Sequence, residues 1–155
     1  MRARAVISGL AVLFVGSAVL ARPDRTFPTV DPQLRLEVRA VVPAPVLTVL
    51  RHACYDCHSN ETRWPWYSHV PPASWLVAHD VKEGRGQLNF SAWGRYNPFD
   101  RADMLDKICD RASKGRMPKW QYRLLHPEAR LTDSEIKAVC DWSGTEAARL
   151  VQGGA

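Results

Sequence analysis

Two cysteines and one histidine lie within five residues, in the stretch Cys54-Tyr55-Asp56-Cys57-His58. If this stretch forms a helical turn, spacings of three and four residues place Cys54, Cys57 and His58 on one side of it. Two thiols on one side can bond to the two vinyl groups of a haem, and the adjacent imidazole can then bind the iron. The spacing therefore indicates the covalent attachment of one haem c, which accounts for all three residues.

Three other uses of the cysteine pair explain less of the sequence. A structural zinc site needs four ligands, commonly from two such pairs, and Cys109 and Cys140 are too far apart in sequence to form a second pair. A thioredoxin-like dithiol is expected within a β-α-β pattern, whereas the flanking residues look helical. A disulfide between Cys54 and Cys57 would leave His58 without a role.

Met117 is the strongest candidate for a second axial ligand of the iron. It lies in "SKGRMPKWQY", between Gly115 and Pro118. Proline disfavours helical backbone at the residue before it, so Met117 is expected in a loop, where its thioether could reach a metal. The alternative is a methionine that fills the core, as methionines usually do, and Met104 on a helix face fits that role.

Histidine ligation opposite His58 is the other possibility. His69 and His79 lie far enough along the chain to reach the second face of a haem. His52 is too close to the motif, and His126, which precedes a proline, is interpreted as a turn residue.

Aromatic residues follow the motif closely and could form the apolar wall of a haem pocket. The same residues could equally form the core of a small domain. Arg63, Trp64 and Arg95 are candidate hydrogen-bond donors to the haem propionates, although surface arginines are usually solvated. The candidate wall residues are Trp64, Trp66, Tyr67, Trp75, Phe90 and Trp93.

Cys109 and Cys140 fall on the apolar faces of two predicted helices. In an oxidising compartment they could form a disulfide between these helices. Two buried free thiols are the alternative, because cysteine packs as a small hydrophobic residue. The sequence leaves both open.

Helical periodicity in four segments predicts an all-α domain with long loops, over residues 43–150. Together with the haem-attachment motif, this helical pattern is similar to that of a small cytochrome c-like domain wrapped round a covalent haem. Thr132 and Glu135 form a capping box for the last helix, and Asp100 is the expected N-cap of the third. Gly84 and Gly86 are expected to end the second helix, and Gly115 the third. The predicted helices cover residues 45–57, 72–83, 100–113 and the chain from 133.

The remaining segments are predicted to be irregular. Residues 22–42 are rich in proline and are interpreted as a linker or extended arm, with a short edge strand as the alternative. The stretch "QLNFSAWGRYNP" is expected to be irregular or a short strand.

The N-terminus has the pattern of a targeting segment. Arg2 and Arg4 precede an uncharged run of 17 residues, 5–21, that ends in small residues. The run fits a signal peptide cleaved before Arg22, and it also fits an uncleaved inner-membrane anchor, which needs roughly 17–25 residues. Both interpretations export the rest of the chain to the periplasm.

The formal net charge of the chain is +5, or +3 after loss of Arg2 and Arg4 (5 − 2). This mild excess, without a dense block of basic residues, argues against nucleic-acid binding. It is compatible with weak docking onto an acidic redox partner protein.

The sequence resembles the bacterial haem-binding domain family, a group of monohaem c-type cytochromes, from about Pro43 to Trp142. The resemblance rests on "ACYDCHSNETRWPWYSHVPPASWLVAHDVKEGRGQLNFSAW" and "GRMPKWQYRLLHPEARLTDSEIKAVCDW". It implies covalent haem binding by Cys54 and Cys57, with His58 as proximal ligand and Met117 at the position of the distal ligand.

The function expected from these features is one-electron transfer by an exported cytochrome rather than catalysis. No nucleophile or general base stands out beside the motif. The alternative is a haem-based peroxidase, or a gas or redox sensor, which would need an open or labile sixth position on the iron.

Overall fold

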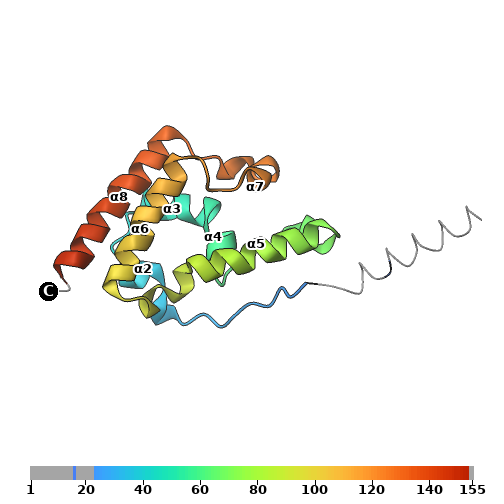
Figure 1. The fold of residues 1–155 in the computed structure, drawn as a ribbon, viewed down its shortest axis with the longest axis horizontal. Coiled ribbons are helices and arrows are strands. Elements are labelled where there is room, and N and C mark those ends of the chain that lie inside the picture. The colour runs from blue at the N-terminus through green and yellow to red at the C-terminus, as the bar shows by residue number, and fades with distance from the viewer. Residues whose placement is uncertain (1–15, 17–22, 154–155) are drawn as a thin grey trace, which may run out of the picture.

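The computed structural model describes residue 16 and residues 23–153 and confirms an all-α fold, with no strand among these residues (Figure 1). Short 3-10 helices, labelled η, connect several of the α-helices. The elements are η1 (Pro32–Leu34), α2 (Leu36–Arg39), α3 (Ala44–Ala53), α4 (Tyr55–His58), η2 (Trp66–His69), α5 (Ala73–Gln87), η3 (Phe90–Arg95), α6 (Pro98–Ser113), α7 (Trp120–Leu125), η4 (Pro127–Ala129) and α8 (Asp133–Gln152).

The first predicted helix is divided in two at Cys54, the first residue of the cysteine motif. Helix α3 ends at Ala53, and Cys54 has φ −124° and ψ −37°, outside helical geometry. The backbone N–H of His58 then donates to the Cys54 carbonyl at 2.9 Å, so α4 forms a separate turn. The prediction of one continuous helix to Cys57 is therefore wrong, and the motif occupies its own short helix.

Helix α5 continues past both glycines that were expected to end it. Gly84 lies inside the helix because α5 packs directly on α4 at this point. A Cβ atom added to Gly84 would lie only 2.5 Å from the carbonyl oxygen of Cys57. The glycine thus permits a close approach of two helices instead of ending one of them.

Helices α6 and α8 pack along each other and form the main helical pair of the fold (Figure 1). The capping box of Thr132 and Glu135 at the start of α8 is confirmed. The N-cap of α6 is Asn97, whose side chain accepts from the N–H of Asp100, so the expectation of Asp100 as the cap is wrong. Gly115 follows α6 with φ +62°, as expected for a helix-terminating glycine.

The segment before α3 packs on the domain. The short strand considered within residues 22–42 is replaced by η1 and α2, and Leu36 of α2 is fully buried. Both short helices contact η3. This 3-10 helix lies within "QLNFSAWGRYNP", which was expected to be irregular or a short strand. Trp93 of η3 is also fully buried in the same hydrophobic core.

Cys109 of α6 and Cys140 of α8 form a disulfide, with their Cα atoms 4.7 Å apart. This settles the choice that the sequence left open. The bond joins the C-terminal half of α6 to the N-terminal half of α8 covalently.

Removing this disulfide should destabilise the protein. The Cys109→Ala/Cys140→Ala variant should lose about 2–4 kcal/mol of unfolding free energy, because a cross-link across 31 residues restricts the unfolded chain. Denaturant unfolding of the haem-loaded protein would measure the loss. The wild type in reductant should show the same lowered midpoint, and an unchanged midpoint for the variant would contradict the prediction.

Candidate haem site

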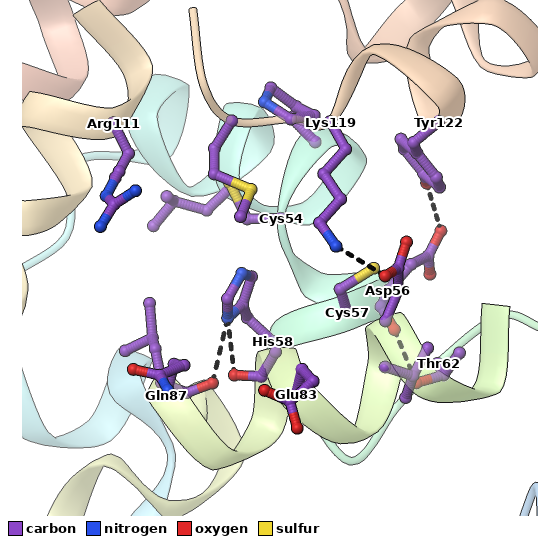
Figure 2. Close-up of a pocket in the computed structure, with 18 of the residues that line it drawn as sticks. Cys54, Asp56, Cys57, His58, Thr62, Glu83, Gln87, Arg111, Lys119 and Tyr122 are labelled. Atoms are coloured by element: carbon purple, nitrogen blue, oxygen red, sulfur yellow. Dashed lines mark hydrogen bonds and ion pairs between the residues drawn. The ribbon is translucent and has the colours of Figure 1, made fainter. Parts of the chain in front are cut away.

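A cavity of about 620 Å³ opens beside α4. Its walls come from α3, α4, α5, α6 and the segment 117–125 (Figure 2), and many of the lining side chains are apolar. The apolar lining residues include Val49, Leu50, Val77, Val81, Ile108 and Val139. An apolar cavity of this size suits a large planar ligand with few polar atoms.

Cys54 and Cys57 both line this cavity and are not joined to each other. Burial raises the pKa of the Cys54 thiol to about 12, and the neighbouring Cys57 adds to the rise. Burial also raises the pKa of Cys57 to about 12, reinforced by the carboxylates of Asp80 and Asp56. Burial thus disfavours the thiolate form of both groups, which is the form that a redox dithiol uses.

His58 projects from α4 into the cavity (Figure 2). Its Nδ1 lies 2.9 Å from the Gly84 carbonyl oxygen and 3.2 Å from that of Leu88. Because carbonyl oxygens only accept, Nδ1 carries the proton and donates it, which leaves Nε2 as the nitrogen that can bind a metal. Burial lowers the pKa of His58, so its imidazole is held in the neutral form that ligation requires.

Met117 lines the same cavity from the loop between α6 and α7. Met104, interpreted from sequence as a core residue, lies on the wall as well. His58 is the only histidine among the lining residues, and all five histidines of the chain lie in the part that the structure describes. The structure therefore gives no support to His69 or His79 as a second ligand.

Asp56, between the two cysteines, connects the motif to α7. Its buried carboxylate accepts from the Arg63 backbone N–H at 3.0 Å and from the Tyr122 hydroxyl at 2.8 Å. The Tyr122 ring stacks on His126 at 4.1 Å, and His126 Nε2 lies 2.8 Å from the Tyr67 hydroxyl oxygen. This network holds the segment that carries Met117 against the segment that carries the cysteines.

A second link crosses between the Met117 loop and α5. The ammonium of Lys119 donates to Asp80 Oδ1 at 2.6 Å, and both residues line the cavity. Neither this link nor the Asp56–Tyr122 bond could be found from sequence, because the partners are 39 and 66 residues apart.

The predicted wall residues divide into two groups. Arg63, Tyr67 and Phe90 line the cavity, although the Arg63 guanidinium is engaged by Asp56. Trp93 lies in the core, and the indole of Trp66 is 76% exposed. The residues expected at the pocket that are not among the lining residues are Trp64, Trp66, Trp75, Trp93 and Arg95.

Lys107 and Arg111 were missed from the sequence. They lie one turn apart on α6 and both line the cavity, with Arg111 extending toward it (Figure 2). Their helical spacing of four residues, on the same face as the lining residues Met104 and Ile108, is the signal that could have found them.

The side chains around the cavity fit a haem. They offer two neutral thiols, an imidazole with a fixed tautomer, a thioether and an apolar enclosure. A zinc half-site does not fit, because no group of three or more His, Cys, Asp or Glu side chains in the described chain could hold a metal ion. A comparison with family models agrees with this chemistry, since the model described as a haem-binding domain matches residues 12–145.

The chain belongs to the haem-binding domain family. The resemblance inferred from the cysteine motif is thereby confirmed, and the match extends over most of the chain. No curated protein and no solved structure matches the sequence significantly.

For this haem-binding domain protein, the described residues contain no helix with the length and apolar character needed to cross a membrane. The uncharged run of residues 5–21, predicted to be a signal peptide or an anchor, lies outside the described residues.

Proposed function

We propose that the protein is an exported monohaem c-type cytochrome that transfers one electron at a time. The observation that supports this most strongly is that one cavity brings together the complete attachment motif and Met117. In this proposal Cys54 and Cys57 bind the haem covalently, while His58 and Met117 are its two axial ligands. A bound haem supplies the redox chemistry, as its iron cycles between Fe(II) and Fe(III).

The chain's own residues would orient the haem and tune its potential. The Gly84 and Leu88 carbonyls accept from His58 Nδ1, hold the ring in place and make its Nε2 a stronger ligand for the iron. A Met117 thioether as second ligand favours the reduced state and raises the potential. The apolar walls exclude water, which also favours the less charged, reduced site.

The Cys109–Cys140 disulfide supports the proposal of export. Disulfides persist in oxidising compartments such as the bacterial periplasm and are rare in the cytosol. Haem c is attached in the same compartment in bacteria, so both features favour a periplasmic site of action. The electron donor and acceptor would then be exported or membrane proteins.

The optical spectrum tests the axial ligands. The oxidised wild type should show the weak far-red band of a thioether bound to ferric haem, and Met117→Ala should abolish it. The midpoint potential of the variant should fall by at least about 0.1 V, a part of the roughly 0.8 V range that axial ligands can span.

Met104→Ala is the matched control, because Met104 is a second methionine on the wall of the cavity. It should keep both the far-red band and the potential. A five-coordinate high-spin spectrum in the wild type would contradict electron transfer and favour a haem peroxidase or sensor with an open sixth position.

A further inference from the structure

The excess positive charge of the chain is concentrated beside the cavity. Residues 111–130 contain six basic residues and one acidic residue, a net charge of 6 − 1 = +5. The whole chain also has +5, so the other 135 residues are balanced, with 15 basic and 15 acidic side chains. This basic segment comprises the end of α6, the Met117 loop, α7 and η4.

Four large apolar side chains are exposed on α7 and in the η2 segment. Trp120 and Leu124, one turn apart on α7, are 62% and 60% exposed. Trp66, the first residue of η2, and Val70, which directly follows η2, are 76% and 50% exposed. None of the four lines the cavity, so a ligand bound inside would leave them uncovered.

The two apolar pairs belong to neighbouring segments. Tyr67 of η2 meets His126, at the end of α7, through the 2.8 Å contact between its hydroxyl and the ring nitrogen. We call the combined surface the rim. It consists of the apolar side chains Trp66, Val70, Trp120 and Leu124 together with the basic side chains Arg116 and Arg123.

The described chain begins next to the rim. The Arg25 guanidinium donates to the Ser68 carbonyl at 2.9 Å and lies 2.6 Å from His69 Nδ1, both in η2. We call residues 23–31, which precede η1, the arm. In Figure 1 the start of the arm is on the same side of the molecule as α7 and the beginning of α5. The uncharged run ends at Ala21, only four residues before Arg25, which spans at most about 14 Å.

We propose that the rim docks on a bilayer surface that contains anionic phospholipid. Tryptophan and leucine beside arginine and lysine are the composition that binds at the lipid headgroup level, with the apolar side chains inserted and the basic ones near lipid phosphates. An acidic protein would satisfy the charges. The position of the arm favours the bilayer, because Arg25 lies only a few residues after the run of residues 5–21 that the sequence predicts to be a signal peptide or membrane anchor.

This docking is independent of the axial ligands of the haem. It would fix the orientation of the domain, with the Met117 side of the cavity turned toward the membrane. Each basic residue near an anionic surface strengthens binding roughly fivefold, so Arg116 and Arg123 would together strengthen attachment roughly 25-fold even if residues 1–21 are cleaved.

Hydrogen–deuterium exchange of the exported, haem-loaded protein tests the proposal. The protein would be mixed with phosphatidylcholine vesicles and with vesicles containing about one third phosphatidylglycerol. We expect amides of α7 and η2 to exchange at least about fivefold more slowly on the anionic vesicles, and α8 to show no change. The comparison holds for a cleaved or an anchored chain, because only the lipid charge differs.

Charge reversal supplies the matched variants. Arg116→Glu/Arg123→Glu should abolish the added protection, whereas Arg95→Glu/Lys137→Glu, an equal charge change at exposed positions away from the rim, should keep it. Both variants should retain the wild-type haem spectrum, which verifies the fold. Equal exchange on the two kinds of vesicle, or equal loss in both variants, would overturn the proposal and leave an acidic protein as the partner of the rim.

Discussion

The Cys54→Ala/Cys57→Ala variant should carry no haem after acid–acetone extraction, whereas the wild type should remain red. Both thiols line the cavity, and removal of both leaves axial coordination as the only strong link to the cofactor. Acid protonates the His58 imidazole and breaks that coordination, so the loss should be complete. Intact mass spectrometry should show the wild type heavier than its polypeptide by the mass of one haem.

Cys109→Ala/Cys140→Ala is the control for this experiment, since it removes the same number of cysteines from the disulfide. It should keep its covalent haem and the wild-type spectrum, with lower stability. Haem that survives extraction from the Cys54→Ala/Cys57→Ala variant, or a wild type that never acquires haem in the presence of cytochrome c maturation factors, would contradict the assignment of the motif.

Gly84→Ala should destabilise the protein, and Gly86→Ala should not. At Gly84 the added methyl group would lie 2.5 Å from the Cys57 carbonyl oxygen and 3.0 Å from its carbon, and both atoms are backbone that cannot rotate away. Helix α5 must therefore move off α4, at a cost of about 1–3 kcal/mol. At Gly86 nothing lies within 4 Å, so alanine should stabilise the helix by up to about 1 kcal/mol.

The same shift should also reach the haem site, because the Gly84 carbonyl accepts from His58 Nδ1. We expect Gly84→Ala to change the midpoint potential as well as the denaturation midpoint, and Gly86→Ala to leave the potential as it is. If both variants changed stability in the same direction, the close approach of α4 and α5 would not be the reason for the glycine.

The parts of the site that depend on local spacing could be predicted from sequence. Cys54, Cys57 and His58 lie on one turn and line one cavity, as their intervals in the sequence predict. The loop position of Met117 follows in the same way from the proline after it. The capping box of Thr132 and Glu135 could also be predicted, because the two residues are three positions apart in the sequence.

The parts that depend on packing could not be predicted. Gly84 resembles a helix terminator until α4 is placed against it. Leu36 lies in a proline-rich stretch that reads as a linker, yet it is fully buried because α2 packs against η3. Trp66 and Trp93 are alike in type, and only the tertiary structure shows that one is exposed and the other is in the core.

The disulfide has a consequence for Met117, the residue proposed as the second ligand of the iron. Cys109 precedes Met117 in the chain and Cys140 follows it, so the bond closes the loop that carries the thioether into a ring. A closed loop samples fewer conformations than an open one, which raises the effective concentration of the thioether at the iron. Reduction of a bond that does not touch the cavity should therefore make Met117 easier to displace by an external ligand such as imidazole.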